Sequence, residues 1–204
     1  MPENTRERIL TQALHLFARD GYEAVSVSSI AGALGITKGA LYRHYPSKRA
    51  IFEAIVERVG CLDREASRAC GVPEDRQDVS DAGYDSTDFA ALRRFTLSQA
   101  RFWMEDEFAV PLRRMLCLEQ YRSEEMGALY QSMLVCGPVD YLADVFSGMM
   151  QAGRMRQAPP RALAADYYAP MLLAICMSDG QTDVRENLAL LERQVDQFIG
   201  EYAL

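Results

Sequence analysis

Lysine is nearly absent from this chain of 204 residues, which has two lysines against twenty arginines. Both lysines, Lys38 and Lys48, lie in one stretch near the N-terminus. Proline is also scarce, with eight residues, and hydrophobic residues make up 49% of the chain, so the composition excludes a disordered or collagen-like protein. The length allows a substantial buried core and favours a small module joined to a larger one.

Long apolar runs and cysteine motifs are missing as well. No segment comes near the roughly 18 consecutive apolar residues that a membrane span needs, and the N-terminus lacks the pattern of a signal peptide. The five cysteines have no CxxC spacing, which favours reduced thiols over a disulfide framework. We therefore expect a cytoplasmic protein with no membrane partner.

The sequence also lacks the groups that common enzyme mechanisms need. It has no GxGxxG motif, no phosphate-binding loop and no evident nucleophile with a base. Its two histidines, His15 and His44, have no cysteine cluster beside them, which argues against a metal centre. We expect no catalytic activity, no cofactor and no metal site.

The formal charge of −7 is unevenly distributed along the chain. Residues 1–48 have six basic and four acidic side chains, a net charge of +2, whereas the remaining residues have a net charge of −9. An acidic body repels nucleic acid, so the N-terminal segment is the part predicted to bind it.

Helix signals fill this N-terminal segment. A first helix is expected between a capping pair at Asn4 and Glu7 and a stop at Gly21. Ser26 is suited to cap a second helix, and Gly35 to take the left-handed conformation that ends it.

A third helix is expected over residues 38–45, with Thr37 as its cap and Pro46 as its stop. Ser47 is suited to cap a fourth helix. Residues 71–87 then interrupt the periodicity with glycine, proline and acidic residues, which indicates an exposed loop.

Helical periodicity returns after this loop. Helices are expected around residues 92–103 and 107–121, over 123–152 with a kink or break at Gly137–Pro138, and over 160–178 and 184–202. The sequence therefore predicts an all-α fold of about nine helices, with a three-helix head over residues 1–48 and a helical bundle over residues 49–204.

The second and third helices form a helix-turn-helix pattern, in which one helix supports another that enters the major groove of DNA. With their flanks they resemble the TetR family of transcriptional regulators. The resemblance rests on Gly21–Tyr22, Ser28–Ser29–Ile30–Ala31, Leu34–Gly35–Ile36, the run from Lys38 to Tyr45, Ser47–Lys48 and Phe52. It implies a homodimer formed through residues 160–178 and 184–202, a DNA-binding head, and a C-terminal domain that binds a small effector.

Seven residues are candidates for contact with DNA, five through the resemblance and two, Arg43 and Tyr45, through their side-chain chemistry. Basic groups and tyrosine hydroxyls are suited to phosphate oxygens. For His44 a solvated surface position is the alternative. The seven are Thr37, Lys38, Tyr42, Arg43, His44, Tyr45 and Lys48.

Soft and aromatic side chains with a few polar tips suit a cavity for an apolar effector, although each of them is also consistent with plain core. The candidates are Phe95, Gln99, Phe102, Trp103, Met115, Tyr121, Met126, Tyr130, Met133 and Tyr141. A thiol switch through Cys117, Cys136 and Cys176 is the rival for what the protein senses.

These observations predict a dimeric transcriptional repressor that binds a palindromic operator in double-stranded DNA and is released by a small-molecule effector. Two alternatives stay open: a redox-sensing regulator, and an effector-binding protein whose head no longer binds DNA.

Overall fold

The computed structural model describes residues 5–73, 87–181 and 183–204. Within these ranges it contains ten helices and no strand, which confirms the all-helical prediction. The helices are α1 (Thr5–Asp20), α2 (Val27–Ala33), α3 (Lys38–Tyr42), α4 (Lys48–Cys70), α5 (Phe89–Glu105), α6 (Ala109–Glu119), α7 (Glu124–Leu134), α8 (Cys136–Gln151), α9 (Pro160–Met177) and α10 (Arg185–Tyr202). The expected cap at Asn4 and most of the loop expected over 71–87 lie outside the described residues.

One helix more than expected appears because residues 123–152 form two helices. The break is at Val135, whose φ of −129° and ψ of −81° leave the helical region, two residues before Gly137–Pro138. Pro138 lies in the first turn of α8, where a proline has no intrahelical bond to lose.

Contacts divide the chain into two compact units. The N-terminal unit comprises Met1–Cys61 and Glu107–Tyr130, and the C-terminal unit comprises Leu62–Asp106 and Gln131–Leu204. The functional division at residue 48 stays a prediction.

The core of the N-terminal unit is aromatic. Phe17 of α1 packs against Tyr22, which follows that helix, and Tyr22 packs against Phe52 of α4, with 5.1 Å between ring centroids in both pairs. Leu41 of α3 and Ile30 of α2 are fully buried. The three head helices therefore pack around a shared core, to which α4 contributes Phe52.

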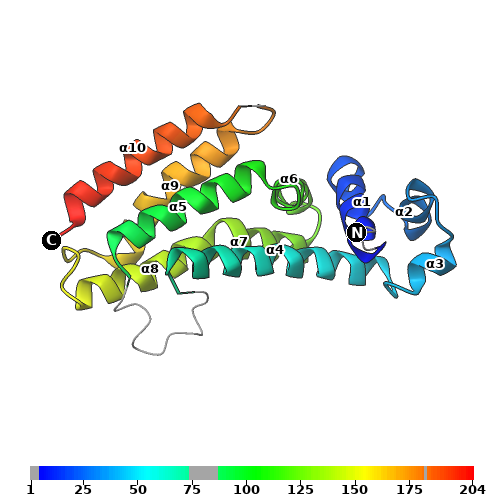
Figure 1. Cartoon of the computed structure of the whole chain (residues 1–204), viewed down its shortest axis with the longest axis horizontal. Helices are drawn as coiled ribbons and strands as arrows, with labels where there is room; N and C mark the ends of the chain where they lie inside the picture. Colours follow the sequence, from blue (N-terminus) through cyan, green and yellow to red (C-terminus); the bar gives the residue numbers. More distant parts are fainter. Residues whose placement is uncertain (1–4, 74–86, 182) are drawn as a thin grey trace. The chain divides into compact units, whose positions relative to one another are not determined.

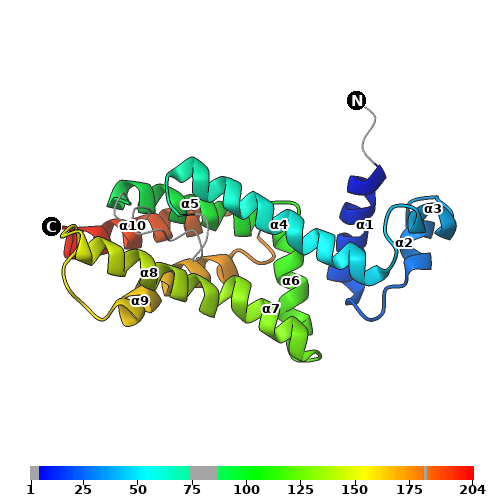
Figure 2. The ribbon, with the colours of Figure 1, turned by 90° about the horizontal axis from the view of Figure 1, so that it is seen from below.

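The core of the C-terminal unit lies where α8, α9 and α10 meet. Helix α9 lies beside α8 and α10, as Figures 1 and 2 show. The rings of Phe146, Tyr167 and Phe198 cluster with centroids 4.6–5.5 Å apart. The Tyr167 hydroxyl forms a 2.8 Å hydrogen bond with Thr96, so its polar atom is satisfied inside the core.

No helix in the described ranges has both the length and the apolar content required to cross a bilayer.

Candidate nucleic-acid interface

Local interactions define both ends of α2. Ser26 Oγ accepts from the Ser29 backbone N–H at 3.0 Å, and Ser29 Oγ accepts from the Ser26 N–H at 2.9 Å, which is a reciprocal capping box. Gly35 has φ of +66°, the left-handed conformation that ends α2. Both expected roles, the cap at Ser26 and the stop at Gly35, are confirmed.

Helix α3 begins as expected and ends earlier than expected. Thr37 Oγ1 accepts from the Ala40 N–H at 3.1 Å, which makes Thr37 the N-cap. The helix stops at Tyr42 instead of residue 45, and a turn follows it. Pro46 disfavours helical geometry at the residue before it, so the final turn is lost.

One face of α3 is exposed and chemically suited to DNA. Leu41 is buried, whereas Thr37, Lys38 and Arg43 are exposed and Tyr42 is 43% exposed. Lys38 Nζ lies 5.7 Å from the centroid of the Tyr42 ring, so a cation and an aromatic hydroxyl are presented together. This face has the donors that phosphate and base edges accept.

The other three candidates for DNA contact, His44, Tyr45 and Lys48, are less exposed than those of α3. His44 is half-buried and Tyr45 is buried, with the Arg6 guanidinium 5.0 Å from the centroid of the Tyr45 ring. Lys48 Nζ donates to the backbone carbonyls of Tyr22 at 2.9 Å and Glu23 at 3.3 Å. In this structure Tyr45 is therefore a core residue and Lys48 an anchor of the α1–α2 turn, and contact of all three with DNA stays a prediction.

The start of that turn also packs against α6 in the same unit. Gly21 has φ of +88°, and a Cβ atom there would lie 2.8 Å from Glu119 Oε1. The Glu119 side chain is buried and forms an ion pair with Arg122 at 3.2 Å. Gly21 is thus required both by its backbone conformation and by the approach of α6.

Ion pairs join α4 to two other helices of the N-terminal unit. Arg49 pairs with Glu125 of α7, and Arg58 pairs with Glu7 of α1 at 3.4 Å. These pairs are solvent-exposed and contribute little stability one by one. They link the part of α4 that lies in the N-terminal unit to α7 and α1.

The ten effector-pocket candidates are divided between the two units. Met115, Tyr121, Met126 and Tyr130 lie in the N-terminal unit, and Phe95, Gln99, Phe102, Trp103, Met133 and Tyr141 lie in the C-terminal unit. Tyr121 is 87% exposed at the end of α6, so it does not line an interior in this structure. The remaining assignments stay predictions.

Two polar side chains of the C-terminal unit are neighbours, the buried Gln99 of α5 and the half-buried Asp63 of α4. Gln99 of α5 is 5% exposed, and its Nε2 forms no hydrogen bond of good geometry with any described residue. Burial raises the pKa of the Asp63 carboxyl on α4, while the neighbouring Gln99 amide and then Arg64 draw that pKa partly back. A buried amide donor with no partner is a feature that a bound ligand would satisfy.

Asp63 was missed by the sequence analysis. Its signal is present in the sequence, because Asp63 continues the spacing of four that places Ile55 and Val59 on the buried face of α4. A carboxylate in register with an apolar stripe indicates a polar site in the interior.

A capped helix-turn-helix on a packed three-helix core, with an exposed face of donor side chains, defines the class of helix-turn-helix DNA-binding proteins. Residues 9–55 match the model of the family described as bacterial regulatory proteins, tetR family. The sequence likeness to this family is therefore carried by the N-terminal segment, about a quarter of the chain.

Solved structures resemble the whole chain. SmeT, the repressor of the Stenotrophomonas maltophilia multidrug efflux pump SmeDEF, is 21% identical with a TM-score of 0.66, over 99% of this chain and 92% of that one. KstR2 of Mycobacterium tuberculosis, a ketosteroid transcriptional regulator, is 15% identical with a TM-score of 0.68, over 100% of this chain and 97% of that one. At these identities the likeness shows the fold alone.

Curated relatives match a shorter segment. The nucleoid occlusion factor SlmA of Marinobacter nauticus is 42% identical over 52 residues, which are 26% of this chain and 27% of the relative. The nucleoid occlusion factor SlmA of Citrobacter koseri is 35% identical over 78 residues, 38% of each chain. The chain thus covers well under half the length of these relatives.

Proposed function

We propose that the chain is a dimeric transcriptional repressor that binds operator DNA through α3 and is released by a small molecule. The observation that carries this proposal is the face of α3, where Thr37, Lys38 and Tyr42 are exposed on a helix whose opposite side, at Leu41, is fully buried. The match of residues 9–55 to the tetR family model supports it. The place of action is the cytoplasm, where the chromosome is accessible.

A dimer would place two copies of α3 in successive major grooves of a palindromic operator, with half-site centres roughly 34 to 36 Å apart. Phosphate contacts from Lys38, Arg43 and the first turn of α4 would supply most of the affinity. Binding is therefore expected to weaken steeply as the salt concentration rises.

The effector is proposed to bind in the C-terminal unit near the buried Gln99 amide, whose Nε2 forms no hydrogen bond of good geometry with the described residues. An apolar molecule with one acceptor oxygen fits an amide donor that lies one helical turn before Phe102 and Trp103 on α5. SmeT, which shares the fold, has been solved as a complex with triclosan. The effector can shift operator affinity only by its difference in affinity between the two conformers, typically about 5- to 150-fold.

The DNA-binding part is tested by selecting bound duplexes from a random pool at moderate salt. Lys38→Ala and Tyr42→Phe are the informative variants, because both side chains are exposed and neither holds the head together. Arg19→Ala is the matched control, since Arg19 is exposed in the head and pairs with Asp20 at 2.7 Å. We expect the wild type and the control to enrich the same palindrome and the two α3 variants to lose it.

Failure of the folded wild-type dimer to enrich any sequence would refute the repressor proposal and favour an effector-binding protein with a silent head. Equal enrichment by Lys38→Ala and Tyr42→Phe would leave the regulator intact and refute the assignment of α3.

Effector binding is tested through the fluorescence of Trp103, the single tryptophan, which lies one helical turn after Gln99. Titration with triclosan is expected to change the emission of the wild type and to weaken its operator binding. In Gln99→Leu we expect a weaker response. Emission and operator affinity that both ignore triclosan and other acceptor-bearing aromatics would refute this site.

Thiol sensing is the second candidate, favoured by the exposure of Cys117, Cys136 and Cys176. Alkylation with N-ethylmaleimide would then change operator affinity with no ligand added, and a variant with serine at the three positions would not respond. An unchanged affinity after complete alkylation would exclude this reading.

A further inference from the structure

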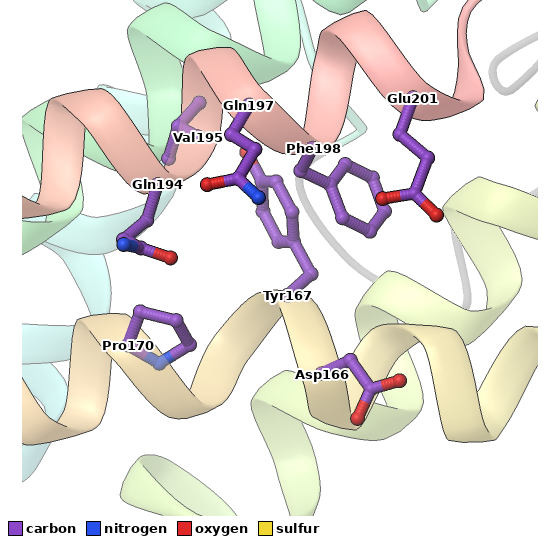
Figure 3. A pocket seen from close by; sticks show the side chains of 8 residues that line it. All are labelled: Asp166, Tyr167, Pro170, Gln194, Val195, Gln197, Phe198 and Glu201. Atoms are coloured by element: carbon purple, nitrogen blue, oxygen red, sulfur yellow. The ribbon is translucent and has the colours of Figure 1, made fainter.

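A groove runs between α9 and α10 on the surface of the C-terminal unit (Figure 3). Asp166 and Glu201 lie at one end, Pro170 and Gln194 lie at the other, and the rings of Tyr167 and Phe198 lie between them. Its volume is about 130 Å³. Ligand pockets for drug-sized molecules have volumes of about 300–1,000 Å³, so this groove suits a single side chain instead.

The lining selects for an arginine side chain. Asp166 and Glu201 are exposed carboxylates with no ion-pair partner among the described residues. Phe198 supplies an aromatic face, and Gln197 an amide whose oxygen accepts hydrogen bonds. A planar guanidinium pairs with carboxylates through several N–H groups and stacks on aromatic rings, which a compact ammonium does less well.

The groove belongs to a longer face that the described residues leave exposed. Asp166, Pro170, Leu173 and Met177 repeat along α9 at spacings of four, three and four, so they lie on one side of the helix. Leu173 is 57% exposed and Met177 is 42% exposed. Exposed apolar residues continuous with an acidic groove indicate a protein partner instead of a solvated surface.

An arginine of the required kind lies on α10 itself. Arg193 is exposed and has no ion-pair partner within the described part of the chain. It precedes Gln197 by four residues, and Glu201 follows Gln197 by four residues. Because residues four apart share a side of a helix, Arg193, Gln197 and Glu201 form one stripe with opposite charges at its two ends.

A stripe of this pattern is self-complementary. When two copies of α10 cross antiparallel about a two-fold axis near Gln197, position 193 of each copy lies opposite position 201 of the other. With a rise of 1.5 Å per residue, each such pair is about 6 Å along the helix from the axis. Both pairs then join opposite charges, and the same surface supplies the groove and the side chain that fills it.

We propose that the occupant of the groove is Arg193 of a second copy of this chain, whose guanidinium pairs with Glu201 and Asp166 and packs on Phe198. This inference rests on the dimer of the proposed function and fixes its register: α10 crosses its symmetry mate at Gln197. The ion pairs are formed twice, and Leu173 and Met177 extend the buried face on α9.

The test uses two opposite charge reversals in the full-length chain, Arg193→Glu and Glu201→Arg. In a homodimer of either variant, both 193–201 pairs join like charges, so the dimer dissociation constant should rise by at least about tenfold. When the two variants are mixed, both pairs are again of opposite charge. An equimolar mixture should then form heterodimers with nearly the affinity of the wild type, measured by analytical ultracentrifugation and by native mass spectrometry of the unequal masses.

Controls separate this register from the dimer itself. Arg101→Glu makes the same change of charge at an exposed residue of α5 and should leave the dissociation constant unchanged. Far-UV circular dichroism confirms that each variant is folded. A dimeric wild type whose charge-reversed variants also dimerise normally, or fail to recover on mixing, overturns the register and leaves the dimer in place. A wild type that is monomeric at micromolar concentration overturns the dimer of the proposed function as well.

Discussion

Replacement of Gly21 by alanine probes the packing that joins α1 to α6 in the N-terminal unit. Two costs are expected. Placing a side chain at φ of +88° costs about 1–2 kcal/mol, because the left-handed region brings Cβ close to the following carbonyl oxygen. The new Cβ would also lie 2.8 Å from Glu119 Oε1, and overpacking of this kind costs about 1–3 kcal/mol when the neighbour is buried, as Glu119 is.

Gly35→Ala separates the two costs. Gly35 has φ of +66° and nothing within 4 Å of its ideal Cβ, so only the backbone cost of about 1–2 kcal/mol applies. Gly21→Ala should therefore destabilise the protein by about 1–3 kcal/mol more than Gly35→Ala. Urea unfolding followed by far-UV circular dichroism measures this difference, and Trp103 fluorescence follows the C-terminal unit separately.

A double-mutant cycle identifies the source of the extra cost. In a Glu119→Ala background the Cβ at position 21 meets no carboxylate, so the penalty of Gly21→Ala should fall to that of Gly35→Ala. Equal losses in the free energy of unfolding for Gly21→Ala and Gly35→Ala in the wild-type background would show that Glu119 moves aside freely. The close approach of α6 would then add nothing to the cost of a side chain at position 21.

Three further results are expected. Thr37→Ala should lose about 1 kcal/mol with its cap to Ala40, whereas Thr37→Ser should retain it, as urea midpoints would show. Lys38→Ala should reduce the slope of log operator affinity against log salt by about 0.9, measured by fluorescence anisotropy. Burial raises the pKa of Asp63, so the folded state holds that proton more tightly than the unfolded chain. The resulting stability is present below the ordinary carboxyl pKa and is lost as pH rises through the raised value. Asp63→Asn should abolish this loss in urea midpoints measured across the acidic range, and an identical pH profile would refute it.

The parts of the head that follow local rules were predictable. Ser26, Thr37 and Gly35 act through hydrogen bonds and dihedral angles within a few residues, so their roles follow from the sequence and the structure confirms them. The end of α3 was predicted too late, because the helix ends at Tyr42 and the residues before Pro46 form a turn in which the N–H groups of His44 and Tyr45 both donate to the Leu41 carbonyl. Helix ends depend on competition between adjacent turns, which a pattern does not resolve.

The parts that depend on tertiary packing were not predictable. Lys48 has a side chain suited to bind phosphate. Its ammonium instead donates hydrogen bonds to two backbone carbonyls of a turn that is 25 residues away in sequence. Tyr45 is likewise buried in the core, and the Arg6 guanidinium lies over its ring. The groove between α9 and α10 joins residues of two helices, and no spacing within one helix reveals it.

The scarcity of lysine makes the head chemically addressable. Besides the α-amino group, the chain has amines only at Lys38 and Lys48, and the Lys48 ammonium donates two hydrogen bonds and lies 4.3 Å from the centroid of the Tyr22 ring. Amine-directed chemistry, whether a laboratory label or enzymatic acetylation, therefore falls chiefly on the exposed Lys38. One modification at that position removes a positive charge from α3 and leaves the acidic body untouched, so the occupancy of a single amine would report on the proposed DNA-binding face.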